Sequence, residues 1–543
     1  MSENGQSGAR RCVSSIPMSP PVPTLEPDAC YLALKARDAR FDGSFFTGVT
    51  STGIYCRPVC RVRTPRRENC RFFGHAAQAE RAGFRPCLRC RPELAPQSVN
   101  WSIQDASAIL AQQAARLLDD PQAWGEAPPT IEQLAARLGI SDRHVRRIFE
   151  AQFGVSPVQY LQTRRLLTAK QLLADTQLPV TQVALISGFA SVRRFNAAFL
   201  AHYGLSPSQL RRAGAERSAR GLAVRLGLRP PYDAAAMLDF FGQRAIRGVE
   251  SVTLDGADGS LVRTLAVRSG PRLQRGWLAA EFDVARHQVL LRVSDGLVEV
   301  LPAVIRRVRD AFDLDADPRD INKALNAAFP GGDGLRVPGA LSGYEVAVRA
   351  VLGQQITVAA ARTLAQRLVD RFGDPVETPW PDVNRLFPEP AVLARAQGDA
   401  LGQLGIVRQR QGAIVAIAQA VDSGRLQLHG GADVRSTIEA LMQLPGIGDW
   451  TAQYIAMRAL RWPDAFPSGD VALHKALGVQ DEPRPARAAL QASEAWRPWR
   501  SYAVIRAWHG LAAHRAAAPP TPLHTTTPAV RPRRALPTAT EAP

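Results

Sequence analysis

The chain has 543 residues, of which 46% are hydrophobic and 21% are charged, and its formal net charge is +18. This length predicts three or four domains, each able to bury its own core. No apolar run approaches the roughly 20 residues of a membrane-spanning helix, and the first residues lack the apolar core of a signal peptide. We therefore expect a soluble, cytoplasmic protein without a membrane partner.

The excess positive charge is concentrated in two segments. Residues 56–93 hold ten arginines against three glutamates, and residues 142–212 hold nine arginines and one lysine against three acidic residues. Local clusters of arginine are typical of proteins that contact the phosphates of nucleic acids. The charge distribution therefore favours a nucleic-acid partner over a merely basic, soluble chain.

All seven cysteines precede residue 91, which argues against a disulfide framework in the rest of the chain. Four of them form two closely spaced pairs, Cys56 with Cys60 and Cys87 with Cys90. Such pairs separated by a loop predict a closed tetrahedral site for one zinc ion. Four unrelated reduced thiols are the alternative. No partner at ligand spacing exists for Cys12, Cys30 and Cys70.

The segments STGIYCRPVC at 51–60 and AGFRPCLRC at 82–90 resemble the N-terminal zinc domain of the adaptive-response (Ada-type) regulators of alkylation repair. The resemblance implies a small α/β domain over residues 28–96, after a disordered leader over 1–27. One zinc-bound thiolate would accept a methyl group from a DNA methylphosphotriester, once per molecule. By position the acceptor is Cys56, with Thr52, Arg63 and Arg85 near the DNA phosphate. A purely structural zinc site is the alternative.

Loss of one thiolate charge on methylation would reduce repulsion from the DNA phosphates. We therefore expect methylation to raise the affinity for DNA.

Residues 97–215 are predicted to form an all-α domain with an internal repeat. Segments 130–157 and 179–207 each carry apolar residues at helical spacing around a turn and end in FGVSP or YGLSP, which predicts tandem helix-turn-helix units. They resemble the DNA-binding domain of AraC-type transcription regulators. The resemblance implies that the second helix of each unit reads the major groove with Arg143, His144, Arg146 and Arg147, and with Arg193, Arg194 and Asn196. RNA polymerase is the further partner that a transcription activator of this kind would have.

The remaining chain divides into two parts with different hydrophobic patterns. Five short apolar runs at 222–228, 249–256, 261–268, 277–283 and 288–295, with one helix after the first, predict an antiparallel α+β domain over 220–300. Every strong segment of 301–513 is helical, and residues 514–543 are expected to be disordered.

Residues 444–477 carry the prediction of chemistry. The helical apolar pattern breaks at LPGIG and resumes at Trp450, which predicts two helices joined by a hairpin. Gly446 and Gly448 would adopt positive φ and let the backbone approach a DNA phosphate. Asp470 precedes the helical VALHKAL, where it would cap that helix and still face a cleft. The alternative for LPGIG is an ordinary turn between helices.

Together with LSGYEVAVRAVLGQQITVAAA at 341–361 and WRPWRSYAVIRAWH at 496–509, this stretch resembles the helix-hairpin-helix DNA glycosylases, and within them the DNA-3-methyladenine glycosylase II family. The resemblance runs from about residue 222 to 508. It implies that a wedge, Leu352, helps to extrude a damaged base from double-stranded DNA. The aromatic faces of Trp450, Tyr454 and Trp508 would hold the base, and Asp470 would stabilise the oxocarbenium-like sugar. Core packing is the alternative for these residues, and the expected role of Trp499.

Two features that the sequence lacks narrow the type of glycosylase that it predicts. Trp450 stands where strand-nicking relatives carry a Schiff-base lysine, and no cysteine follows Cys90, so we expect no iron–sulfur cluster. The sequence therefore predicts a fusion of an Ada-type regulator with a monofunctional glycosylase that removes 3-methyladenine and related bases and works on nucleoid DNA. The alternatives are a regulator whose glycosylase half is a non-catalytic DNA clamp, and a glycosylase that the regulator half only tethers to DNA.

Overall fold

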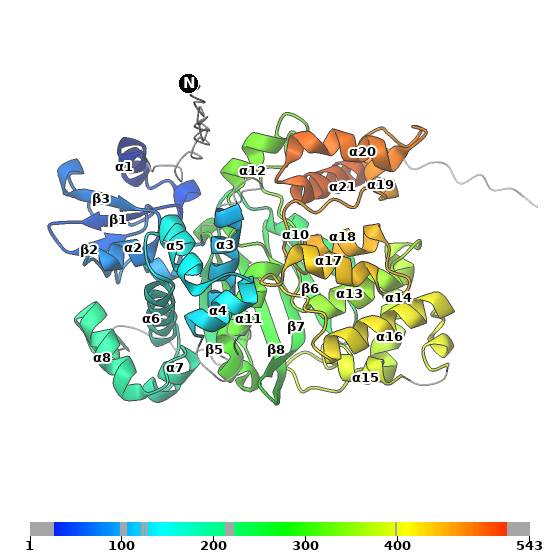
Figure 1. Ribbon diagram of the computed structural model, residues 1–543, viewed down its shortest axis with the longest axis horizontal. Helices are drawn as coiled ribbons and strands as arrows, with labels where there is room; N and C mark the ends of the chain where they lie inside the picture. Colours follow the sequence, from blue (N-terminus) through cyan, green and yellow to red (C-terminus); the bar gives the residue numbers. More distant parts are fainter. Residues whose placement is uncertain are drawn as a thin grey trace, which may run out of the picture.

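The computed structural model describes residues 26–97, 106–120, 124, 129–211, 222–396 and 399–517 (Figure 1). Most of the predicted leader and tail lies outside the described residues. Helix α1 (Pro27–Ala36) begins at the end of the predicted leader, and α21 (Arg500–Ala517) runs four residues into the predicted tail. No helix of the described ranges is long and apolar enough to cross a membrane.

The N-terminal domain is a small four-stranded sheet with the order β3-β1-β2-β4. Its elements are β1 (Phe46–Val49), β2 (Ile54–Cys56), β3 (Cys70–Phe73), β4 (Arg85–Pro86) and α2 (Ala76–Arg81), beside α1. β2 pairs with β4 in parallel, while β1 pairs with β2 and β3 in antiparallel fashion. The buried rings of Phe46, Tyr55 and Phe84 form its core, and the predicted α/β class is confirmed.

The second domain is helical and has the predicted repeat. Its helices are α3 (Ala106–Asp119), α4 (Ile131–Leu138), α5 (Asp142–Phe153), α6 (Pro157–Asp175), α7 (Val180–Ile186), α8 (Val192–Tyr203) and α9 (Pro207–Arg211). Both α5 and α8 start at a serine N-cap and end at a left-handed glycine, Gly154 or Gly204. Residues 98–105 of the expected first helix lie outside the described ranges.

The third domain is the predicted antiparallel sheet, with the order β5-β9-β8-β7-β6 and one covering helix. Its elements are β5 (Leu222–Gly227), α10 (Ala234–Gly242), β6 (Glu250–Asp255), β7 (Asp258–Ser269), β8 (Arg272–Asp283) and β9 (Gln288–Val293). Strands β7 and β8 are longer than the apolar runs that predicted them, because their hairpin ladder continues through polar residues as far as the Ser269–Arg272 pair.

The C-terminal half is a helical bundle, most of which is drawn to the right of the sheet in Figure 1. It comprises α11 (Leu301–Ala311), α12 (Pro318–Leu325), α13 (Gly343–Leu352), α14 (Val358–Phe372), α15 (Pro390–Ala394), α16 (Arg408–Asp422), α17 (Val434–Met442), α18 (Asp449–Arg458), α19 (Val471–Ala476), α20 (Pro485–Ser493) and α21. Two apolar cores form within it. One is built around α13 and α16, and the other around α21, with α18 contributing to both.

The regulator-like half and the bundle-bearing half share one hydrophobic core. Leu172 of α6 and Phe199 of α8 belong to the same buried cluster as Val224 of β5 and Leu291 of β9. The second helix-turn-helix unit therefore packs directly on the sheet of the third domain. Residues 212–221, which connect them in sequence, lie outside the described ranges.

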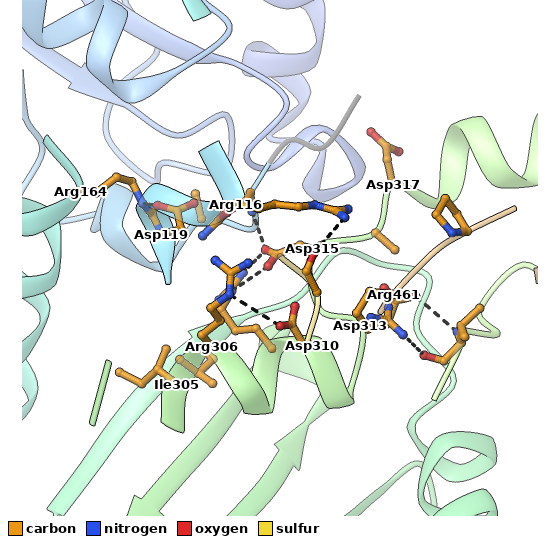
Figure 2. A pocket seen from close by; sticks show the side chains of 18 of the residues that line it. Arg116, Asp119, Arg164, Ile305, Arg306, Asp310, Asp313, Asp315, Asp317 and Arg461 are labelled. Atoms are coloured by element: carbon orange, nitrogen blue, oxygen red, sulfur yellow. Dashed lines mark hydrogen bonds and ion pairs between the residues drawn. The ribbon is translucent and has the colours of Figure 1, made fainter. Parts of the chain in front are cut away.

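A polar seam continues this contact. Arg229 is 1% exposed and its guanidinium donates to carbonyl oxygens on both halves, those of Asp42, Pro96, Gln97, Asp315 and Ala316. Beside it lies a cavity of about 170 Å³ lined with charged side chains (Figure 2). Arg164 pairs with Asp119 at 2.8 Å on one side and Arg461 with Asp313 on the other. Five arginines and six acidic residues line it, so its charges nearly cancel and the seam serves to join the domains.

Candidate functional site

The four predicted zinc ligands meet in the N-terminal domain. Cys56 ends β2 and Cys87 follows β4, its parallel neighbour, so the sheet brings the two cysteine pairs together. The Sγ atoms of Cys56, Cys60, Cys87 and Cys90 all lie within 4.8 Å of one another. Sulfurs around one tetrahedral zinc are about 3.8 Å apart, because each Zn–S bond is about 2.3 Å. The cluster is therefore the site of one zinc ion.

The ligands differ in their surroundings. Cys56, Cys60 and Cys87 are buried, whereas Cys90 is partly exposed. The backbone N–H of Arg57 donates to Cys90 Sγ at 3.4 Å, and the Arg57 side chain pairs with Asp42. The remaining described cysteines, Cys30 and Cys70, are buried outside the cluster, and Cys12 lies beyond the described residues.

The residues predicted to contact phosphate are all exposed, namely Thr52, Arg63 and Arg85. Thr52 lies in the turn between β1 and β2, where its hydroxyl donates to the Val49 carbonyl at 3.3 Å. Arg85 also donates to the Tyr203 carbonyl of α8 at 3.5 Å. Their contact with DNA stays a prediction.

The recognition helices α5 and α8 bury one face and expose the other. Val145, Phe149, Phe195 and Phe199 are fully buried. The opposite faces carry the predicted base-reading side chains, of which Arg143, Arg146, Arg147, Arg193, Arg194 and Asn196 are exposed and His144 is half-buried. An exposed polar face on the second helix of each unit is what insertion into a major groove requires.

One carboxylate of the zinc domain links the residue beside a zinc ligand to helices α6 and α8. Glu80 accepts hydrogen bonds from the Tyr55 hydroxyl at 3.0 Å and from the Thr163 hydroxyl at 2.6 Å, and pairs with His202 at 2.9 Å. Tyr55 immediately precedes the ligand Cys56, and His202 lies on α8. Sequence patterns give no sign of this cluster, because its members come from separate elements.

Arginines of the same region contact the C-terminal ends of both recognition helices. Arg81 donates to the Gly154 carbonyl after α5 at 2.6 Å, as Arg85 does to the Tyr203 carbonyl of α8. Positive charge at a helix C-terminus is favourable. The zinc domain therefore fixes the positions of both helices.

The predicted hairpin joins α17 to α18. Gly446 has a φ of 75°, as expected. For Gly448 the expected positive φ is wrong: its φ is −97° and its ψ is 176°, an extended conformation that other residues also adopt. No side chain caps the first turn of α18, for which Gly448 is the N-cap, so its N–H groups are open to a phosphate oxygen.

Asp470 lies at the wall of a large cleft of about 980 Å³. It caps α19 by accepting from the Leu473 N–H at 2.7 Å. Its carboxylate also accepts from the indole N–H groups of Trp450 at 3.0 Å and Trp508 at 3.1 Å. The predicted catalytic carboxylate and two predicted pocket aromatics are thus one hydrogen-bonded group.

Tyr454 completes the aromatic wall. Its ring stacks on Trp450 with a centroid distance of 5.3 Å and an interplanar angle of 11°. Trp508 lies 6.4 Å from Tyr454 between ring centroids. All three are partly exposed to the cleft, whereas Trp499 is only 8% exposed and belongs to the core, as expected.

The burial of Leu352 contradicts its predicted role as a wedge. It is 0% exposed, because it ends α13 on the face that packs into the core. Three residues later, Gln355 is exposed and left-handed, with a φ of 56°. Its neighbour Gln354 donates to the Gly446 carbonyl at 2.9 Å, which fixes this turn on the hairpin. The exposed tip of this turn is therefore Gln355.

Four family models match the chain in the order of its structural units. Residues 29–93 match the metal binding domain of Ada, residues 134–213 a helix-turn-helix domain, residues 223–342 the AlkA N-terminal domain, and residues 348–498 the HhH-GPD superfamily of base excision DNA repair proteins.

Relatives match either the whole chain or one half. The chain is 36% identical over 496 residues to the probable bifunctional transcriptional activator/DNA repair enzyme AlkA of Mycobacterium tuberculosis. The alignment covers 89% of this chain and 96% of that protein. It is 35% identical over 284 residues to DNA-3-methyladenine glycosylase 2 of Escherichia coli, covering 52% of this chain and 96% of that protein. To the bifunctional enzyme Ada of E. coli it is 32% identical over 241 residues, or 44% of this chain and 62% of that protein.

Proposed function

Because the chain belongs to the family of bifunctional transcriptional activator/DNA repair enzymes, we propose that it repairs alkylated DNA with one half and senses the same damage with the other. The C-terminal half hydrolyses the N-glycosidic bond of 3-methyladenine and related bases. The observation that carries this is the position of Asp470, a carboxylate held between two indoles at the wall of a cleft that can hold a base.

The glycosylase half acts on an extruded base. The hairpin and the open first turn of α18 grip the DNA backbone, and Gln355 fills the gap that the base leaves. An alkylated ring carries positive charge and leaves readily, and the electron-rich faces of Trp450 and Trp508 attract it. As the bond stretches, the carboxylate of Asp470 stabilises the positive sugar and takes a proton from the attacking water.

The test is release of free 3-methyladenine from methylated duplex DNA by the purified protein and by Asp470→Asn. Asparagine still caps α19, so the variant folds, and its single-turnover rate should fall about 100-fold or more, the loss expected when one charge-stabilising group is removed. Asp433→Asn, at the exposed N-cap of α17 and outside the cleft, is the matched control. Equal release by Asp470→Asn would remove Asp470 from the mechanism. No release by the parent would favour the non-catalytic clamp.

The N-terminal half accepts a methyl group at Cys56. Zinc, when bound, keeps the four sulfurs anionic at neutral pH. The Cys56 sulfur attacks the methyl carbon of a methylphosphotriester, the C–O bond breaks, and an ordinary phosphodiester is restored. Cys90 is more exposed, but the N–H that it accepts from Arg57 makes its sulfur a weaker nucleophile. After exposure to methylphosphotriester DNA, peptide mass spectrometry should find one added methyl on Cys56; a label on Cys90 would overturn the assignment.

Methylation turns the regulator on. It removes one negative charge from a surface that faces DNA, which raises affinity for an operator read by α5 and α8. The partner at the promoter is RNA polymerase, and the protein works with it on cytoplasmic DNA. A gel-shift titration at fixed salt should show tighter operator binding by the methylated protein than by Cys56→Ser treated in the same way. Equal affinity would leave the regulator half as a tether.

A further inference from the structure

The recognition helices α5 and α8 correspond position by position. Each has 12 residues, follows a serine N-cap and ends before a left-handed glycine. Each also buries its fourth, eighth and twelfth residues, which are Val145, Phe149 and Phe153 in α5 and Phe195, Phe199 and Tyr203 in α8. Residues that lie 50 apart in the sequence therefore occupy the same place on the two helices, so their outer faces can be compared residue by residue.

The outer faces differ in chemistry at three matched positions. In α5 the fifth, sixth and ninth residues are charged, namely Arg146, Arg147 and Glu150. In α8 the same positions hold an amide and two apolar side chains, namely Asn196, Ala197 and Leu200. All of these side chains are exposed, and Leu200 is 53% exposed. The second position, by contrast, is an exposed arginine in both helices.

The side chains that differ make no contact that the fold requires. Among the described residues, neither the Arg146 guanidinium nor the Asn196 amide has a hydrogen-bond partner in the protein. Leu200 lies one turn beyond Asn196 on the same face, because residues four apart on a helix are neighbours. Its apolar surface lies outside the core that the inner face of α8 helps to form. These side chains are therefore available to a partner of the helix.

The major groove of DNA presents a different set of donors, acceptors and methyl groups for each base pair. An arginine donates two N–H groups to O6 and N7 of guanine, and a carboxylate accepts from N4 of cytosine. An asparagine amide bonds N6 and N7 of adenine, and apolar side chains contact the methyl group of thymine. The charged set on α5 therefore matches G·C pairs, and the amide and apolar set on α8 matches A·T pairs.

We propose that the operator has two unlike half-sites, one of G·C pairs read by α5 and one of A·T pairs read by α8. In the first, Arg146 bonds guanine and Glu150 bonds cytosine. In the second, Asn196 bonds adenine and Leu200 contacts a thymine methyl group. The arginine at the second position of each helix makes the contact that the half-sites share. The inference rests on the operator binding proposed above and adds the base preference of each half-site to it.

The fold fixes the order of the two half-sites. The zinc domain holds the C-terminal ends of both helices, through Arg81 at α5 and Arg85 at α8. The buried residues of α8 belong to the core shared with the sheet of the third domain, whereas those of α5 belong to a separate core. The helices therefore cannot exchange places. The protein binds the operator in one direction, with the repair half next to the A·T half-site.

The experiment selects binding sites for the zinc-loaded, methylated protein from a library of random duplexes. The parent should enrich one site with a G·C half and an A·T half. Asn196→Arg gives α8 the residue that α5 has at this position. It should shift the preference at one position of the A·T half from adenine to guanine, by about tenfold or more in relative affinity. Arg146→Asn should make the reverse change in the G·C half. Both positions are exposed, so the variants fold and each is the control for the other.

Replacement of thymine by deoxyuridine in the selected operator tests Leu200. The replacement removes only the methyl group, so it should weaken binding by the parent about fourfold, the contribution of one buried methyl group. Leu200→Ala should bind the two operators equally, as measured by fluorescence anisotropy. An equal loss in the parent and in Leu200→Ala would overturn the role of Leu200.

Two kinds of failure are distinguishable. Half-sites of equal composition would overturn the inference, as would selection of the parent's site by Asn196→Arg, or a change confined to the G·C half. In each of these cases the parent still selects a sequence, and the operator binding stands. Enrichment of no sequence by the parent would instead overturn the operator binding itself.

Discussion

Asp470 is the residue on which three helices converge. Its hydrogen-bond donors are Trp450 on α18, Leu473 on α19 and Trp508 on α21. The helix cap and the indole contacts restrict the carboxylate to one orientation. A carboxylate fixed before the substrate arrives needs no reorganisation when the sugar becomes positive, which is the main source of electrostatic catalysis.

Trp508→Phe tests this preorganisation. The substitution keeps an aromatic ring at the cleft and removes one N–H donor to Asp470. A hydrogen bond to a charged group is worth about 1.5 kcal/mol or more, so the single-turnover rate for 3-methyladenine should fall about tenfold, since 1.36 kcal/mol corresponds to a factor of ten. Trp499→Phe, in the core, is the comparison. An equal fall in both variants would mean that packing, and not the indole N–H, sets the rate.

At the scale of elements, the two glycines of the hairpin between α17 and α18 have different roles, one in folding and one in contact with DNA. Gly446 is left-handed, and a Cβ there would lie 3.3 Å from Ala413 Cβ. Gly448 is extended and a Cβ there would meet nothing within 4 Å. Folding therefore requires the first glycine, while the second leaves room for a partner.

Two alanine substitutions should separate these roles. Gly446→Ala should lower the free energy of unfolding by about 1 to 2 kcal/mol, the cost of a left-handed residue with a side chain. Gly448→Ala should leave thermal stability within about 0.5 kcal/mol and weaken binding to undamaged duplex DNA. Denaturant melts and fluorescence anisotropy measure the two quantities. Unchanged DNA affinity in Gly448→Ala would show that the backbone at this point does not approach DNA.

The contact between the zinc domain and α8 is sensitive to pH. The hydrogen bond from His202 to Glu80 raises the pKa of the imidazole above its ordinary 6.5. The stabilisation is therefore complete below pH 6.5 and is lost as pH rises through the raised folded-state pKa. Wild type should be more stable than His202→Asn at pH 6, and this difference should shrink by pH 8.5, measured by thermal melts of zinc-loaded protein. A difference that is constant with pH would exclude the ion pair as its cause.

The molecule as a whole unites a reader of DNA and a repair bundle through buried contacts. The second helix-turn-helix unit shares a core with the sheet of the third domain, and Arg229 donates to carbonyls from both halves. A shared core makes unfolding of one half expose apolar surface of the other. We therefore expect the second helix-turn-helix unit and the sheet to unfold together, although their chemistries are separate.

Arg229→Met tests the coupling. Methionine fills much of the space but leaves buried carbonyls without a donor, at a cost of at least about 3 kcal/mol in total. Calorimetry should show one main transition for the wild type and an earlier transition of the zinc domain in the variant. Arg225→Met removes the more exposed ion pair with Asp175 and should shift the transition by much less. Two separate transitions in the wild type would contradict the coupling.

Local patterns were enough to predict the four domain classes, the meeting of the four cysteines and the cap that Asp470 makes on α19. The cysteine pairs and the cap before VALHKAL are signals within a few residues of one another. The buried Leu352 contradicts the assignment because the resemblance placed the wedge in the VLGQQ turn without showing which of its residues turns outward; the exposed residue is Gln355, with a left-handed φ. The contacts of Arg229 with Asp42 and of Glu80 with His202 span 187 and 122 residues. No periodic pattern encodes pairs at such separations.

The shared core has a consequence for the ratio of sensor to glycosylase. Helices α6 and α8 pack on the repair half. Separating the regulator half from the repair half would therefore expose apolar surface on both fragments. Each glycosylase is then made with its own sensor, at a fixed ratio of one to one. Every molecule that takes up a methyl group and binds a promoter removes one glycosylase from the search for damage. The response to damage therefore lowers the number of free glycosylase molecules, which new synthesis must replace.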